Sequence, residues 1–98
     1  MAQGQVVNAL SSVSHTQFVD IKPGTGVEWA IHNIYYSGGN VDFYLTNGTD
    51  LLKFGSDSTA GTLSGDIVFH VTNSIWIRVT NTSGGTLLIG YDGVQTSA

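Results

Sequence analysis

The chain has 98 residues, a length that allows one domain, with a net charge of −4, three basic residues and no cysteine. So few cations argue against binding to nucleic-acid phosphates, and no apolar run approaches the length of a membrane span. The lack of cysteine excludes disulfides, thiolate chemistry and cysteine-ligated zinc, and fits synthesis in a reducing cytosol.

The first third of the chain predicts an arm followed by two strands. Residues 1–15 are small and polar, and we expect an N-terminal arm or an edge strand there, without the basic and apolar regions of a secretory signal. Residues 16–22 (TQFVDIK) predict a strand that ends at a Pro-Gly turn. Residues 27–36 (VEWAIHNIYY) predict the longest strand, in which the apolar parity changes near His32 and indicates a β-bulge.

Residues 41–54 carry the clearest hairpin signal. The Asn-Gly pair in the middle of this stretch is the preferred pair for a two-residue type I′ turn. A turn at this pair places Phe43 opposite Leu52 on one face and Asp42 opposite Lys53 on the other. The agreement of these cross-strand pairs favours a real hairpin.

The rest of the chain predicts a long polar loop at 55–65, three strands at 67–71, 75–80 and 86–91, and a short tail at 92–98. Strict alternation in IWIRVT and its neighbours is the period of β-structure. We expect the three strands to pair in sequence as an antiparallel meander. The alternative, that they lie in different sheets and never pair, stays open.

In these last strands one parity supplies enough apolar side chains for a core. They are Ile67, Phe69, Val71, Ile75, Ile77, Val79, Leu87 and Ile89. The opposite parity, which should be polar on a solvated sheet face, also carries apolar residues. Such a face needs a cover from elsewhere in the chain or from another subunit, and the low charge favours a homo-oligomer. The candidate interface residues are Trp76, Val68 and Leu88, with Tyr44 and Leu51 from the hairpin.

The strands and turns together predict the fold class. About eight short strands alternate with turn signals, and no stretch has a helical period. This pattern is typical of a sandwich, a jelly roll or a small barrel. We expect an all-β, single-domain antiparallel β-sandwich or jelly roll over residues 16–98, preceded by the arm or edge strand at 1–15.

The titratable residues give no convincing catalytic or metal site. Glu28 is the only glutamate, and beside Trp29 its pKa would be raised as in a general acid, although an exposed strand residue is the simpler interpretation. His15, His32 and His70 lie on separate segments without the spacing of metal ligands.

Calcium and sugar sites are two further possibilities. Asp57 and Asp92 could hold calcium, but their surroundings lack the spaced carboxylates of a calcium loop. Five strand aromatics could form a sugar-stacking platform, although core or interface positions are commoner for such residues. They are Trp29, Tyr35, Tyr36, Tyr44 and Trp76. We therefore expect no enzyme activity, no metal and no cofactor.

Three stretches, EWAIHNIYYSGG, FHVTNSIWIRVTN and IGYDGVQT, resemble small virion structural proteins of tailed bacteriophages. The resemblance covers most of the chain from about Phe18 to Thr96. It implies a head decoration or cement protein: a sandwich or jelly roll, often trimeric, that binds the major capsid protein on the head exterior after synthesis in the host cytoplasm. It implies adhesion without an active site. The alternative is a carbohydrate-binding or receptor-binding module of a phage tail or fibre.

Overall fold

The structure, a computed structural model, describes residues 5–38, 40–58, 61–63 and 68–97. These residues form nine strands and no helix, which confirms the expected all-β class. No helix in this described part could therefore span a membrane. The strands are β1 (Val6–Val13), β2 (Phe18–Ile21), β3 (Glu28–Tyr36), β4 (Val41–Thr46), β5 (Leu51–Asp57), β6 (Gly61–Leu63), β7 (Phe69–Thr72), β8 (Trp76–Asn81) and β9 (Leu87–Ser97).

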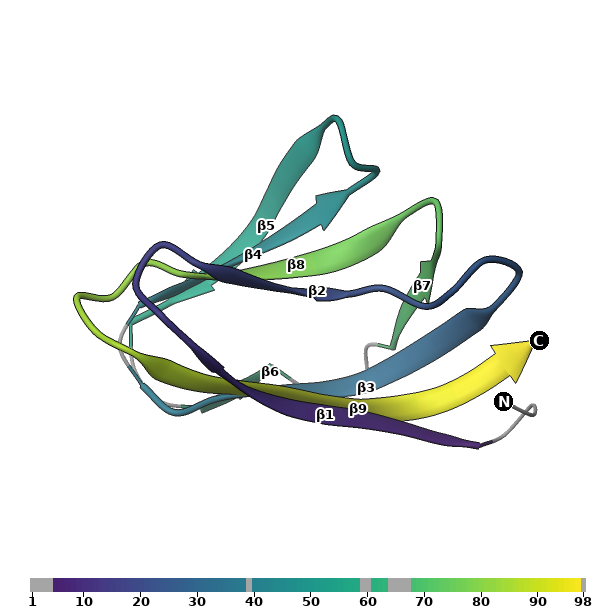
Figure 1. Cartoon of the computed structure of the whole chain (residues 1–98), viewed down its shortest axis with the longest axis horizontal. Coiled ribbons are helices and arrows are strands. Elements are labelled where there is room, and N and C mark those ends of the chain that lie inside the picture. Colours follow the sequence, from purple (N-terminus) through teal and green to yellow (C-terminus); the bar gives the residue numbers. More distant parts are fainter. Residues whose placement is uncertain (1–4, 39, 59–60, 64–67, 98) are drawn as a thin grey trace.

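The strands form two antiparallel sheets that pack face to face as a β-sandwich (Figure 1). Sheet A has the order β1-β9-β3-β6, with β7 also pairing with β3, and sheet B has the order β2-β8-β4-β5. The chain crosses to the other sheet at every connection except β4–β5 and β6–β7. This alternation of sheets along the chain is the strand order of a jelly roll.

The core lies between the two sheets, where the inward parity of each strand meets the other sheet. Of the residues predicted for the core, the buried ones are Val71, Ile77, Val79, Leu87 and Ile89. Phe69 is half-buried, whereas Ile75 is exposed because it precedes β8 at the turn from β7. Ile67 lies outside the described residues.

The expected meander of the last strands is wrong. β7 and β9 pair with β3 in sheet A, whereas β8 pairs with β2 and β4 in sheet B. β8 and β9 therefore face each other across the core, and the alternative that these strands never pair holds. Their shared apolar parity is explained equally well by two sheets facing each other as by one sheet, because both arrangements bury one side of every strand.

The hairpin of β4 and β5 forms, but its turn is longer than predicted. Thr46 lies opposite Leu51, so four residues rather than two make the connection. Asn47 Oδ1 accepts hydrogen bonds from the backbone N–H groups of Thr49 and Asp50, at 2.9 and 2.8 Å, and closes this wider loop.

The longer turn shifts the register by two residues and the bulge adds a third, so Phe43 lies opposite Gly55 instead of Leu52. Asp42 lies opposite Ser56 instead of Lys53, with a bulge between Phe43 and Tyr44. Lys53 Nζ nevertheless reaches Asp42 Oδ1 at 3.4 Å. The predicted ion pair therefore forms without the predicted register.

Four further predictions concern the bulge near His32, the loop at 55–65, the tail at 92–98 and the N-terminal residues. The β-bulge predicted near His32 is confirmed by a register shift between Ile31 and Asn33 against β9. The polar loop at 55–65 is wrong in part, because β5 extends into it and β6 lies within it. The tail at 92–98 is wrong, because β9 continues to Ser97. Within residues 5–15, the described part of the expected arm or edge strand, the structure contains the edge strand β1.

Candidate interaction surface

Trp76 lies on the outer face of sheet B but is only 6% exposed. The Lys22 ammonium group sits 4.1 Å from the centroid of its ring, and Gly48 of the β4–β5 loop lies against the edge of the ring. A cation over an indole face is attracted by the ring quadrupole, while the lysine stem excludes water. The cover that sequence reasoning required for Trp76 is therefore supplied by this chain.

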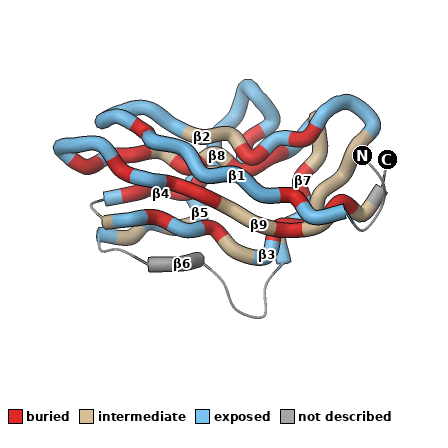
Figure 2. Tube along the Cα trace, turned by 60° about the horizontal axis from the view of Figure 1, so that its bottom comes forward, coloured by how far each residue is buried: buried red, intermediate tan, exposed pale blue. Residues whose placement is uncertain are grey.

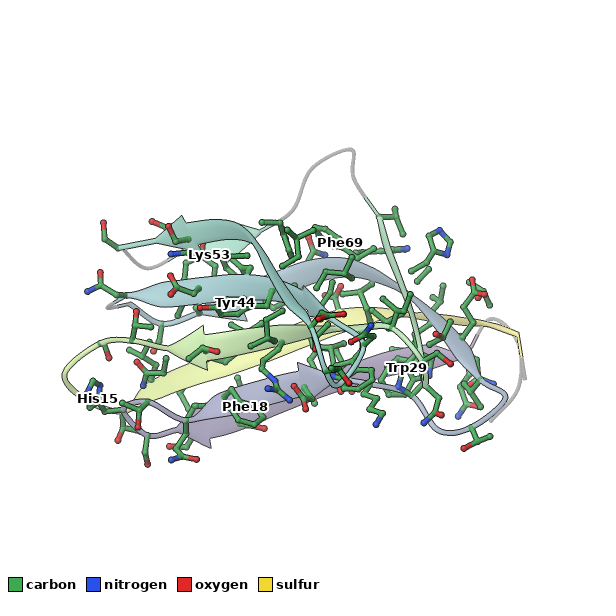
Figure 3. All side chains as sticks on the ribbon, turned by 90° about the horizontal axis from the view of Figure 1, so that it is seen from above. His15, Phe18, Trp29, Tyr44, Lys53 and Phe69 are labelled. Atoms are coloured by element: carbon green, nitrogen blue, oxygen red, sulfur yellow. The ribbon has the colours of Figure 1, made fainter. Side chains whose placement is uncertain are left out.

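The same outer face holds all three basic side chains of the protein. Arg78 donates two hydrogen bonds to the Asp20 carboxylate, from Nε at 2.7 Å and from Nη2 at 3.1 Å. Its guanidinium carbon lies 3.9 Å from the centroid of the Phe18 ring, and Asp20 raises the pKa of Arg78. Tyr44 is half-buried next to Lys53 on this face (Figure 3). The charged groups here are largely satisfied by one another, so the face is polar and self-contained.

The outer face of sheet A is less charged and more apolar. Leu10 and Tyr35 flank Gly90 across three neighbouring strands, and all three positions are directly opposite one another. Leu88, two residues before Gly90 on the same face of β9, is 48% exposed. The Tyr35 hydroxyl donates to Asp92 at 2.6 Å, and Asp92 raises the pKa of Tyr35. Exposed aliphatic groups therefore surround a hydrogen-bonded tyrosine on this face.

A second apolar region lies at the tip of the β4–β5 hairpin, which splays away from sheet A (Figure 1). An open depression of about 360 Å³ is lined by aliphatic side chains together with Thr46, Asn47 and Asp50. We call its four aliphatic residues the hairpin-end patch: Leu45, Leu51, Leu52 and Ile75. All four are exposed, Leu52 to 63%. The patch lies where sheet B extends past the cover of sheet A.

The five residues predicted for one interface are spread over separate parts of the molecule. Leu88 is on the outer face of sheet A, Trp76 and Tyr44 are on the outer face of sheet B, and Leu51 is in the hairpin-end patch. Val68, just before β7, is exposed. They separate because β8 and β9 are in opposite sheets, so their outward parities point in opposite directions.

Glu28 does not have the raised pKa considered for a general acid. Its carboxylate lies 3.0 Å from His70 Nδ1, and this hydrogen bond, with a further contribution from Thr96, lowers the pKa of Glu28. Glu28 lies opposite Thr72 and His70 opposite Ala30, so the two side chains meet diagonally across β3 and β7 on the outer face of sheet A. This arrangement favours an ionised strand residue over a proton donor.

The histidines are not gathered into one site. His15 lies in the β1–β2 turn, at the opposite end of the sandwich from Trp29 (Figure 3), whereas His32 and His70 are on β3 and β7. In the described part of the chain, no three histidine, aspartate or glutamate side chains are close enough to share a metal ion.

The aspartates considered for calcium accept hydrogen bonds from protein groups. Asp57 accepts the Tyr36 hydroxyl at 2.6 Å, and Asp92 accepts both Tyr35 and the Asn33 side-chain amide. Burial, with help from Asp57, raises the pKa of Tyr36 to about 12. Asp57 thus links the two sheets, and Asp92 links two strands of sheet A.

The sugar-stacking aromatics do not form one platform. Tyr36 is buried, and half-buried Trp29 packs against Tyr91 with ring centroids 6.2 Å apart. Tyr35 and Tyr44 project from opposite outer faces of the sandwich. Tyr35 is the most exposed of the five aromatics and has Asp92 and Asn33 beside it.

Sequence reasoning missed most of the hairpin-end patch, because it assigned Ile75 to the core, placed Leu52 opposite Phe43 on one face of the hairpin, and named only Leu51 as a contact residue. No local signal predicts this exposure, because alternation gives the direction of a side chain and not how far the opposite sheet covers it.

No protein-family model and no curated protein matches this chain. Among solved structures it is similar to the capsular polysaccharide assembling protein CapF from Staphylococcus aureus, with a TM-score of 0.42 and 13% sequence identity. The similarity covers 93% of this chain and 24% of that chain, so the chain spans about a quarter of the length of its structural neighbour. A likeness this distant carries no argument about function.

Proposed function

We propose that this chain is a non-enzymatic assembly protein, and specifically a decoration (cement) protein on the head exterior of a tailed bacteriophage. The observation that supports an adhesive role is the hairpin-end patch, where four large aliphatic side chains are exposed around one depression. Contiguous exposed apolar surface is typical of protein contact sites. The choice of the capsid as partner comes from the resemblance of the sequence to phage virion proteins.

Burial of the hairpin-end patch on the major capsid protein would supply the binding energy. Fully burying one leucine or isoleucine side chain is worth roughly 1.5–3 kcal/mol, so a patch of four is sufficient for a moderate contact. A homo-oligomer would gain further strength because several contacts act together. A protein that binds the assembled lattice and not free subunits stabilises the lattice.

The test adds the purified protein to heads that lack it and measures occupancy and thermal melting of the heads. We expect saturable binding that raises the melting temperature and depends only modestly on salt, because the patch is apolar. Leu52→Lys should weaken binding at least tenfold, about 1.4 kcal/mol, because it places a charge in the contact. Leu88→Lys, on the outer face of sheet A, is the matched control and should bind as the parent does.

Two results would count against this proposal. A protein that leaves heads unbound and retains glycans on an array, with retention lost in Tyr35→Ala, would be a carbohydrate-binding module instead. Loss of head binding in Leu88→Lys but not in Leu52→Lys would reject the hairpin-end patch and move the contact to sheet A.

A further inference from the structure

The edge strand β1 leaves one side open. It pairs with β9 along its whole length, and no other strand in the described part of the chain pairs with it. Its middle five residues, 8–12, are all exposed, and Leu10 is 70% exposed. Figure 2 shows most of β1 in the colour of exposed residues, with buried positions only near its two ends.

The pairing with β9 tells which backbone groups of β1 are open. Gln95 N–H donates to Gln5 C=O at 2.9 Å, directly before β1, so odd-numbered residues turn their backbone groups toward β9. By the alternation of an antiparallel ladder, even-numbered residues turn theirs away. The outward groups belong to Val6, Asn8, Leu10 and Ser12.

The other edge strands carry protection that β1 lacks: β6 and β7, at the far edge of sheet A, have only three and four residues. β2 has only four residues, includes Asp20 and is followed by Lys22 and Pro23. β5 contains Lys53 and Asp57, with a bulge in its pairing to β4. Charges, proline, short length and bulges all discourage a further strand from pairing. β1 (VVNALSSV) has eight residues without charge or proline, so it is the edge strand best suited to pair with a further strand.

We propose that β1 pairs antiparallel with β1 of a second copy about a twofold axis, which extends sheet A across both molecules. Opposed residues must lie on the same face of the joined sheet, so the dyad falls on a residue and not between two. With the axis at Leu10, the two Leu10 side chains meet on the outer face, and Asn8 of each copy faces Ser12 of the other. The outward N–H and C=O groups of Leu10 then bond reciprocally.

A second copy fits this edge because the strand is neutral. An identical strand with a lysine or aspartate would place like charges near each other across the axis, whereas β1 has none to repel its own copy. The exposed Leu10 lies on the outer face as a diagonal neighbour of Leu88, and the exposed Val6 lies on the same face opposite Val94, so pairing also covers apolar surface. This proposal does not rest on the capsid role, since it concerns the free protein alone.

Amide hydrogen exchange on the full-length protein tests the edge directly. At low concentration the amides of Ala9 and Ser11, bonded to β9, should be protected, while those of Asn8, Leu10 and Ser12 should exchange rapidly. Raising the concentration into the dimer range should slow the even-numbered amides at least tenfold. Rapid exchange of these amides in a fully formed dimer would overturn the proposal.

Sedimentation velocity on two matched variants gives a second test. Leu10→Lys should raise the dimer dissociation constant at least tenfold, because two lysines meet at the axis, with the circular dichroism spectrum unchanged. Leu52→Lys, an equally exposed leucine on β5, should leave the dimer intact. If Leu10→Lys fails to fold, the exposed Asn8→Lys makes the same test. A monomeric or trimeric parent, or dissociation in Leu52→Lys alone, would contradict β1 pairing.

Discussion

The Tyr36 side chain joins β3 of sheet A to β5 of sheet B. Its ring lies 5.5 Å from that of Phe43 in an edge-to-face contact, and its hydroxyl donates to Asp57 at 2.6 Å. Burial and the neighbouring carboxylate both disfavour the phenolate, which is why the pKa of Tyr36 is about 12. One side chain therefore contributes to both packing and hydrogen bonding between the sheets.

Tyr36→Phe should make the free energy of unfolding less dependent on alkaline pH. The folded chain holds the Tyr36 proton more tightly than the unfolded chain, in which the pKa is near 10.0. Its contribution is therefore fully present below pH 10 and is lost as the pH rises toward 12. Below pH 10 the variant should lose about 1 kcal/mol with the hydrogen bond.

Urea unfolding at a series of alkaline pH values measures both effects. Tyr44→Phe is the matched control, because the Tyr44 hydroxyl lies a longer 3.5 Å from Asp42. Equal pH profiles for the parent and Tyr36→Phe would show that this hydroxyl does not hold its proton as described.

The pairing of β3 with β9 depends on a glycine opposite the bulge in β3. Gly93 lies opposite Ile31, next to the register shift, and a Cβ atom there would overlap the Ala30 carbonyl oxygen. The obstacle is backbone, which cannot rotate away as a side chain can. The close approach of the two strands therefore requires a residue without a side chain at position 93.

Gly93→Ala should destabilise the protein by about 3 kcal/mol, because the strands must separate to admit the methyl group. Gly84→Ala is the matched control: the β8–β9 loop has nothing within 4 Å of the added atom, and the change should stay within about 0.5 kcal/mol. Chemical denaturation of both variants is the measurement. Similar midpoints for the two would show that β3 and β9 tolerate a wider spacing.

Sequence alternation predicted the core better than it predicted strand pairing. The side of a strand that is buried is a local property, so Ile77, Val79 and Ile89 were assigned to the core even though their strands were paired wrongly. The choice of partner strand depends on the whole topology, which local alternation does not predict. β8 and β9 follow each other in sequence, yet the chain crosses the core between them.

The same limit explains what was missed on the surface. Trp76 points outward by parity, but it is covered by Lys22. Lys22 is distant in sequence and directly follows β2, the strand that pairs with β8. Ile75 was assigned to the core and Leu52 was placed opposite Phe43, yet the hairpin tip extends beyond sheet A and both are exposed. Cover is a property of the packed molecule, so parity alone predicts direction and not burial.

At one end of the sandwich, hydrogen bonds of the Asn81 side chain hold neighbouring segments together; Asn81 is the last residue of β8. Its side-chain amide donates to the carbonyl oxygens of Val13, at 2.8 Å, and Gly85, at 2.7 Å. Its Oδ1 accepts the backbone N–H of Ser83 at 2.8 Å. One fully buried side chain thus ties sheet B to the end of β1 and to the β8–β9 loop.

Asn81→Ala should lower the free energy of unfolding by about 3 kcal/mol, because the carbonyl groups of Val13 and Gly85 and the amide of Ser83 lose their hydrogen-bond partner together. Asn81→Asp should cost more, since a carboxylate would face two carbonyl oxygens. Both variants should still unfold in one cooperative step. Asn73→Ala, in the β7–β8 turn, is the control and should be nearly neutral. Thermal unfolding measures the series, and a mild effect of Asn81→Asp would contradict the hydrogen-bond assignment.

The placement of charge gives the molecule a preferred orientation as it approaches a partner. The outer face of sheet B carries three cations, Lys22, Lys53 and Arg78, against the two carboxylates of Asp20 and Asp42, whereas the outer face of sheet A carries the carboxylates of Glu28 and Asp92. The excess on sheet B is one positive charge, from three cations and two carboxylates, and it opposes two carboxylates on sheet A, so a small dipole runs across the sandwich. At low ionic strength a negatively charged surface would turn sheet B toward itself before contact, and a positively charged surface would turn sheet A. Added salt removes this bias, so the fraction of encounters that begin with the correct face depends on ionic strength even where the final contact is apolar.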